Sequence, residues 1–343
     1  METILKRWLL IVMGLIASIV IIGGITRLTG SGLSMVDWQP IMGSIPPLSS
    51  DTWEQTFNAY KQSPEFQQIN STMTLSEFKF IFFWEYLHRM LGRLIGLAAF
   101  LPFVIFSIQK KLSRAFTWRW LGIITLIGCQ GLMGWYMVKS GLVDIPHVSH
   151  FRLAAHLSLA FLIFCLVLRE YLYLVFPGEK LKLSRNMIIT RLILVGISIQ
   201  IVYGAFTAGL NGGHYYNTYP KMGPDWFPDA ALMYAGGIMN NALNNPIMIQ
   251  WIHRWLGVII VIGVIYMWRQ CQQSQHHLIQ YSGLLLLTAV SFQFLLGIIT
   301  LLTGVWLPVA IAHQFGALVL LASGTLLAYL FGHQQERLQK NDV

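Results

Sequence analysis

Charged residues are scarce in this chain of 343 residues. Only 11% of them are Asp, Glu, Lys or Arg, whereas a typical soluble domain has about 25%. This shortage excludes an ordinary soluble enzyme, and a hydrophobic content of 55% also excludes a disordered protein. Cysteine is scarcer still. Cys129, Cys165 and Cys271 are too few and too widely spaced for a disulfide framework or a thiolate metal site.

Long apolar runs take the place of the missing charge. Eight segments are long enough to cross a bilayer core, which requires about 20 apolar residues. They cover approximately residues 8–26, 78–108, 118–138, 151–175, 187–210, 246–268, 278–304 and 307–331. The first run is longer than the apolar part of a signal peptide and lacks a cleavage site. The sequence therefore predicts an all-α integral membrane protein with eight transmembrane helices.

The net charge indicates an orientation in the membrane. A formal charge of +9 would suggest nucleic-acid binding if it lay on one soluble face. With eight crossings, however, the side that holds both termini collects 14 of the 23 basic residues and only 5 of the 14 acidic ones. The positive-inside rule makes that side cytoplasmic. We therefore expect cytoplasmic termini, outward-facing loops at 27–77 and 211–245, and no nucleic-acid partner.

The chain contains an internal repeat. The run EYLHRMLGR at 85–93 recurs as QWIHRWLG at 250–257, and QGLMG at 130–134 recurs as QFLLG at 293–297. A second histidine follows in each half, at His156 and His313. The pattern predicts two pseudo-symmetric four-helix bundles side by side, one in residues 1–180 with the long loop 27–77 and one in residues 181–343.

Four histidines mark the predicted sites. His88, His156, His253 and His313 lie within roughly three turns of the start of inward-running helices, and hence in the outer half of the membrane. A histidine in a membrane helix usually faces the bundle interior and marks a functional site; a packing hydrogen bond is the alternative. Zinc usually takes at least three protein ligands, whereas haem iron takes two axial imidazoles. We therefore predict one haem in each bundle.

Charged residues accompany these histidines. Arg89, Arg93 and Arg254 are next to a histidine or one turn from it and are expected to pair with haem propionates, with snorkelling to the headgroups as the alternative. Glu85 lies three residues before His88 on nearly the same helix face. The second repeat has glutamine at this position. The carboxylate is suited to proton transfer, and an ion pair with Arg89 or Arg93 is the alternative.

The first long loop has readable structure. Helix starts are predicted near Ser50 and at Thr74, where Glu77 completes a capping box. Aromatic residues recur at helical spacing from Trp53 onward, which is typical of an amphipathic helix at the membrane interface. This helix is interpreted as a lid over the first haem site or as an interfacial anchor. His147 and His150 are expected to be plain loop residues ahead of the next helix, rather than iron ligands.

Several motifs together resemble the haem A synthase family. They are GGITRLTGSGLS at 23–34, Trp38, the prolines at 46–47, SPE at 63–65, the Glu-x-x-His-Arg-x-x-Gly-Arg run at 85–93, NTYPKM at 217–222 and HQFGA at 313–317. The resemblance covers nearly the whole chain. It implies oxidation of the C8 methyl group of haem O to a formyl group through a hydroxylated intermediate, which gives haem A for terminal oxidases.

The resemblance also implies roles for the two halves. His253 and His313 would keep a haem b in the C-terminal half, and His88 and His156 with Glu85 would receive haem O, which leaves as haem A, in the N-terminal half. The expected location is the bacterial cytoplasmic (inner) membrane, with the haem sites toward the periplasm. Expected partners are haem O, an electron-transfer protein, haem O synthase, terminal oxidase assembly factors and, in a homo-oligomer, further copies of the chain.

Two other function classes deserve comparison. A membrane dihaem b-type cytochrome that transfers electrons from quinol is the alternative, although such a carrier would more naturally hold its haems at different depths. A haem transporter would need a polar path through the inner half of the helices, and none is evident in the sequence.

Overall fold

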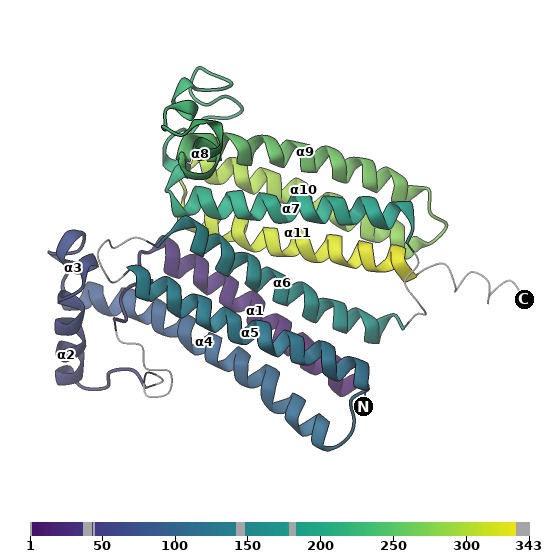
Figure 1. The fold of residues 1–343 in the computed structure, drawn as a ribbon, viewed down its shortest axis with the longest axis horizontal. Coiled ribbons are helices and arrows are strands. Elements are labelled where there is room, and N and C mark those ends of the chain that lie inside the picture. The colour runs from purple at the N-terminus through teal and green to yellow at the C-terminus, as the bar shows by residue number, and fades with distance from the viewer. Residues whose placement is uncertain (1, 37–42, 44, 142–147, 178–182, 334–343) are drawn as a thin grey trace, which may run out of the picture. The chain divides into compact units, whose positions relative to one another are not determined.

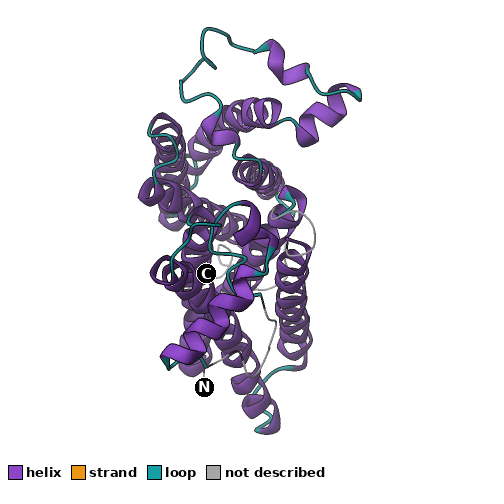
Figure 2. Cartoon of the chain, turned by 90° about the vertical axis from the view of Figure 1, so that its left-hand side faces the viewer, coloured by secondary structure: helices purple, strands orange, loops and turns teal. Residues whose placement is uncertain are grey.

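The computed structural model describes residues 2–36, 43, 45–141, 148–177 and 183–333. Within these ranges the regular elements are helices and no strand is present (Figure 2). Eight helices are long and apolar enough to cross a membrane. They are α1 (Glu2–Leu28), α4 (Leu75–Ile108), α5 (Arg114–Gly141), α6 (His150–Val175), α7 (Arg185–Gly209), α9 (Pro246–Gln272), α10 (His277–Leu302) and α11 (Leu307–His333). The predicted all-α membrane fold is confirmed.

Side-chain caps explain where several helices begin. Glu77 N–H donates to Thr74 Oγ1 at 3.4 Å, and Thr74 N–H donates to Glu77 Oε2 at 2.8 Å. This capping box starts α4 where the sequence predicts it. Short helices lie in the loops: α2 (Ser50–Lys61), α3 (Pro64–Gln68), η2 (Gly212–His214), η3 (Asp229–Leu232) and α8 (Gly237–Asn244). The N-cap of α2 is Ser49, one residue before the predicted start.

The chain divides into two compact units. One comprises Gly14–Ala160, and the other comprises Met1–Met13 with Phe161–Val343. In the second unit, α7, α9, α10 and α11 are neighbours in that cyclic order and form a four-helix bundle (Figure 1). In the first unit, α4 packs on α5. The predicted boundary at 180/181 and the pseudo-symmetry of the halves stay predictions.

The first long loop packs on α4 through an aromatic cluster. The cluster consists of Met35, Phe57, Tyr60, Phe78, Ile81 and Phe82, all buried. The rings of Tyr60 and Phe78 stack with centroids 4.9 Å apart, and Trp53 meets Phe82 edge to face at 5.1 Å. The predicted amphipathic helix is therefore present as α2, and its aromatic face contacts protein. Its role as a lid stays a prediction.

Much of the surface of the long helices is apolar. On α4, for example, Phe83, Leu97 and Phe100 are each about half exposed. A soluble protein rarely leaves such continuous apolar surface in water, whereas hydrocarbon is a suitable environment for it. The fold is accordingly that of a multi-pass membrane protein.

Candidate functional site

Each of the four predicted histidines packs against a glycine of the preceding long helix. The contacts are His88 with Gly23 of α1, His156 with Gly134 of α5, His253 with Gly204 of α7, and His313 with Gly297 of α10. A Cβ atom added to these glycines would lie 2.9, 3.2, 3.1 and 2.9 Å, respectively, from the histidine Cε1. A larger residue would collide with the ring. Glycine therefore lets each imidazole reach between its two helices.

These contacts lie at similar heights along their helices. Gly23, Gly204 and Gly297 each precede the last residue of their helix by five positions, and Gly134 precedes it by seven. Two of these glycines belong to each unit. The structure thus gives all four histidines the same glycine contact, while their common depth in the membrane stays a prediction.

His253 and His313 face each other in the second unit. Their ring centroids lie 6.4 Å apart, and their planes are nearly perpendicular at 88°. Two imidazoles that share one metal ion have centroids roughly 6 Å apart, since each metal–nitrogen bond is about 2 Å and the nitrogen lies about 1 Å from the ring centre. In the described part of the chain, no three His, Cys, Asp or Glu side chains converge. The two imidazoles are suited to hold one metal ion between them, as the two histidines of a haem site would.

The structure brings His88 and His156 into the first unit. The Nδ1 atoms of both are buried without a hydrogen-bond partner, as are those of His253 and His313. Gln130 Nε2 donates to the carbonyl oxygen of His156 at 3.0 Å and lies 3.3 Å from His156 Nε2. Buried imidazoles with unsatisfied nitrogens are candidates for metal ligation.

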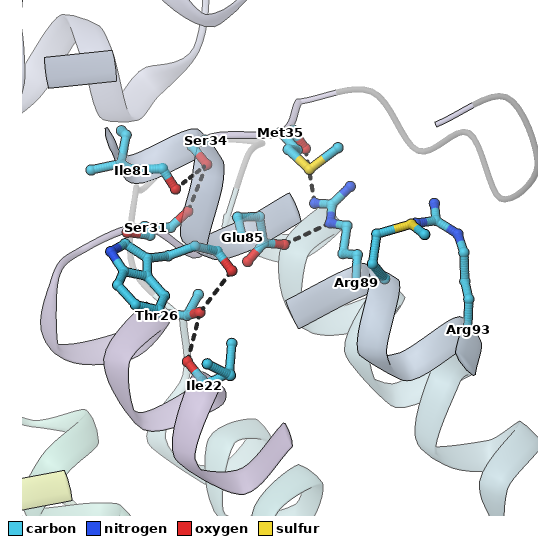
Figure 3. Close-up of polar contacts among 11 residues, drawn as sticks. Ile22, Thr26, Ser31, Ser34, Met35, Ile81, Glu85, Arg89 and Arg93 are labelled. Carbon is cyan, nitrogen blue, oxygen red and sulfur yellow. Dashed lines mark hydrogen bonds and ion pairs between the residues drawn. The ribbon is translucent and has the colours of Figure 1, made fainter. Parts of the chain in front are cut away.

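Glu85 is a buried ion-pair partner of Arg89. The carboxylate residue is 4% exposed, and Arg89 Nε donates to Glu85 Oε1 at 2.6 Å (Figure 3). A second guanidinium nitrogen of Arg89 donates to the carbonyl oxygen of Met35 at 2.9 Å. The ion pair that the sequence left as an alternative is present. It fixes the carboxylate one turn before His88, where removal of either partner would leave an uncompensated buried charge.

The beginning of the first loop is tied to the same part of α4. Ser34 Oγ donates to the carbonyl oxygen of Ile81 at 3.3 Å, and Thr26 Oγ1 donates to that of Trp84 at 3.3 Å (Figure 3). These bonds join the end of α1 and the residues after it to the turn of α4 that precedes Glu85. These hydrogen bonds therefore fix the position of the helical turn next to the carboxylate.

In the second unit, the equivalent arginine is bound by main-chain oxygens. Arg254 donates through Nη1 to the carbonyl oxygens of Thr218 and Lys221, at 2.7 and 3.1 Å, and through Nη2 to that of Tyr216 at 2.8 Å. Gln250, at the position of Glu85, also donates to Tyr216, at 3.1 Å. Main-chain oxygens replace the carboxylate. Arg254 Nε remains buried without a partner, so it has a donor available for an anionic group.

Arg93 lies one turn beyond Arg89. Its Nη1 is 3.5 Å from the sulfur of Met90 (Figure 3), and the residue has further interactions. None of these contacts tests whether Arg89, Arg93 or Arg254 binds propionates, so this assignment stays a prediction.

His150 corrects one sequence-based expectation. It does not precede the helix: it is the first residue of α6, it is 8% exposed, and its ring lies on Phe151 with centroids 4.1 Å apart. The residue that was expected in a loop is therefore a buried helical residue in contact with an aromatic neighbour. His147 and Trp38 lie outside the described residues.

The sequence analysis assigned no function to Glu65, which was noted only as part of the SPE motif at 63–65. Glu65 is 7% exposed and accepts a hydrogen bond from Tyr60 Oη at 3.1 Å, while Asn70 Nδ2 donates to Tyr60 Oη at 2.8 Å. Burial raises the pKa of Glu65 to about 7, the Tyr60 hydrogen bond opposes this rise, and the negative charge of Glu85 adds to it. The only sequence signal was an acidic residue among the aromatic residues of the loop.

Known proteins are similar in sequence to nearly the whole chain. A family model described as cytochrome oxidase assembly protein matches residues 6–325. A "Heme A synthase" of Rhodospirillum centenum is 42% identical over 318 residues, covering 91% of this chain and 84% of that protein. "Heme A synthase COX15" of Mus musculus is 43% identical, with coverages of 95% and 81%. A "Heme A synthase" of Orientia tsutsugamushi is 38% identical, with coverages of 93% and 94%.

Proposed function

Because the chain belongs to the family of cytochrome oxidase assembly proteins, and its relatives in that family are heme A synthases, we propose that it is itself a haem A synthase. The reaction is oxidation of the C8 methyl group of haem O to a formyl group through a hydroxylated intermediate. The resemblance noted in the sequence pointed to this activity, and similarity over more than nine-tenths of the chain supports it. The protein is then an oxidoreductase that acts on a CH group.

The second unit is proposed to hold a haem b. His253 and His313, whose rings lie 6.4 Å apart, are the residues that would hold its iron. The unpartnered Arg254 Nε offers a hydrogen bond to a propionate. A haem at this place would supply one-electron chemistry. The chain's part is to orient the two imidazoles through Gly204 and Gly297.

The first unit is proposed to receive haem O between His88 and His156. Its distinguishing observation is the buried carboxylate of Glu85, whose counterpart in the second unit is Gln250. Conversion of a methyl group to an aldehyde, with water as the source of the oxygen atom, releases four protons and four electrons, so protons must leave the site. In this proposal the Glu85 carboxylate accepts them, and the hydrogen bond from Arg89 keeps it in one position.

The proposed setting in the cell follows the charge distribution. Both termini face the cytoplasm, the two long loops face outward and the histidine sites lie toward that outer side, in the inner membrane of a bacterium. An electron-transfer partner must remove the electrons released by the oxidation. Haem O synthase, terminal oxidase assembly factors and other copies of the chain are the proposed further partners.

Glu85→Gln tests the proposal, because it copies the residue found at Gln250. The variant is expected to bind haem in the first unit and to accumulate haem O or the hydroxylated intermediate, with haem A formation reduced by about 10²–10⁴-fold. Extraction of haem from purified protein, followed by chromatographic separation, measures the three haem types. Glu54→Gln, at an exposed carboxylate of α2, is the matched control. Haem A formation at the wild-type rate in Glu85→Gln would refute the catalytic role.

A further inference from the structure

Three of the four histidines are also held by a glutamine. Gln200 Nε2 donates to the carbonyl oxygen of His253 at 2.8 Å, and Gln293 Nε2 donates to that of His313 at 2.9 Å. Gln130 makes the same bond to His156 at 3.0 Å. Each glutamine therefore joins the helix that carries the glycine contact to the helix that carries the histidine.

The glutamines and glycines form one spacing pattern. Gln130, Gln200 and Gln293 each lie four residues before the glycine that contacts the histidine, as in QGLMG, QIVYG and QFLLG. Four residues are about one helical turn, so the glutamine and the glycine lie on the same face of the helix. The corresponding segment of α1 is IVIIG at 19–23. His88 is thus the one histidine of the four whose glycine lacks the accompanying glutamine.

Ile19 occupies the place that glutamine holds elsewhere. A Cβ atom added to Gly257, four residues after His253, would lie 3.3 Å from Gln200 Nε2. A Cβ atom added to Gly92, four residues after His88, would lie 3.7 Å from Ile19 Cδ1. The two helix pairs therefore place residues 19 and 200 at equivalent positions. All four residues at this position, Ile19 and the three glutamines, are partly buried.

The glutamines also bring an unused hydrogen-bond acceptor to the helix pairs that carry these histidines. An imidazole that binds a metal through Nε2 carries a proton on Nδ1 and usually donates it to a neighbouring oxygen. The Nδ1 atoms of all four histidines and the Oε1 atoms of all three glutamines are buried without partners. Each of the three helix pairs thus combines an unused ring nitrogen with an unused amide oxygen, whereas Ile19 offers no such oxygen to His88.

We propose that Gln130, Gln200 and Gln293 are positioning residues that hold three of the histidines, and that His88, beside Ile19, is the weakly held ligand through which the first unit exchanges its haem. This inference rests on the proposed function, because a site for substrate must release its product. The second unit, with both histidines held, would keep its haem b. In the first unit only His156 is held, and Gln130 also lies near its Nε2.

The test measures how fast haem leaves the purified full-length protein. Apomyoglobin in excess takes up the released haem, and extraction identifies it by type, so that haem O and haem A report on the first unit and haem b on the second. Ile19→Gln should slow the release of haem O and haem A by about threefold to tenfold, the range expected for one additional hydrogen bond. Ile19→Leu, which adds no polar group, is the matched control.

Loss of the glutamines should have the opposite effect. Gln200→Leu and Gln293→Leu are expected to speed haem b release by a similar factor, whereas Ser198→Ala, at an exposed hydroxyl of α7, should not. Wild-type release rates in Ile19→Gln and in both leucine variants, with helix content unchanged by circular dichroism, would overturn the proposal.

Two further outcomes are decisive. If Ile19→Gln does not assemble, Gln130→Leu replaces it: faster release of haem O and haem A supports the proposal, and an unchanged rate contradicts it. If wild-type protein contains neither haem O nor haem A, the proposed function fails instead. In that case haem b release from the Gln200→Leu and Gln293→Leu variants still decides whether the glutamines hold the histidines.

Discussion

The first and second units build different surroundings for the same His-Arg pair. Arg89 is bound by the carboxylate of Glu85 and one main-chain oxygen, whereas Arg254 is bound by three main-chain oxygens of the loop after α7. Both arrangements satisfy a costly cation in an apolar helix. Only the first introduces a group that can accept and release a proton.

This difference helps to distinguish a residue that only neutralises an arginine from one that takes part in the chemistry. If neutralisation of the arginine were the whole purpose, main-chain oxygens would serve in both units, as they do for Arg254. A carboxylate has a higher desolvation cost than a main-chain oxygen, because its own charge must be compensated in the same apolar surrounding. The presence of the carboxylate in the first unit therefore favours the proposed proton transfer there. Its absence from the second unit favours the proposed role of stable haem binding.

The largest expected effect is loss of haem b from the second unit. His253→Ala and His313→Ala each remove one proposed haem ligand from a bundle that α7, α9, α10 and α11 already form, so nearly all haem b should be lost while the fold assembles. A pyridine haemochrome spectrum measures the loss. His214→Ala, an exposed residue of the same unit, is the control. An unchanged low-spin spectrum in both variants would contradict the assignment.

An intermediate effect is expected from Glu65 in the loop of the first unit. Because its pKa in the folded protein, about 7, is above the ordinary value of 4.5, folding favours the protonated form. The docking of α2 and α3 on α4 should therefore weaken as the pH rises from 4.5 to 7, by on the order of 2 kcal/mol between pH 5 and 7.5. Besides burial, Tyr60 and Glu85 are the groups that shift this pKa.

Hydrogen exchange of the α2 amides, corrected for the intrinsic pH dependence of exchange, measures this effect. Glu65→Gln cannot ionise and should show protection that does not change over the same pH range. Equal pH profiles for wild type and Glu65→Gln would show that the loop docks independently of this carboxyl group.

The smallest expected effect concerns the arginines. Arg→Lys at positions 89, 93 and 254 keeps the charge but loses the forked geometry, so each variant should retain its haem several-fold less well. Haem retention in the second unit should fall clearly, since a lysine has one nitrogen in place of the two through which Arg254 reaches its three carbonyl oxygens. Haem content after dilution in detergent measures retention. Wild-type retention in all three variants would support snorkelling instead.

The length of the apolar runs was sufficient to predict the eight long helices, because apolar runs of this length have one stable form in a bilayer. The capping box at Thr74 was also readable, since the bonding side chains lie three residues apart. The four histidines were found because two short motifs repeat. Local patterns of this kind carry their own structural meaning.

Contacts between distant segments could not be predicted in the same way. Glu85 had two candidate partners at suitable spacing, and only the structure shows that Arg89 is bound. The Met35 oxygen that shares this arginine is 54 residues away in sequence. Likewise, the burial of Glu65 depends on how the loop folds back on α4, which no local pattern encodes. The glutamine at position 200 could have been found from its spacing to Gly204.

The length of α4 has a mechanical consequence. With 34 residues, this helix measures about 50 Å, roughly 20 Å more than the hydrocarbon thickness of a bilayer. Its first turns contact the aromatic residues of α2 through Phe78 and Phe82, and further along it carries Glu85 and His88. One continuous rod therefore connects the loop to the interior of the bilayer, so that a force applied to the loop is transmitted directly to the turn that carries Glu85.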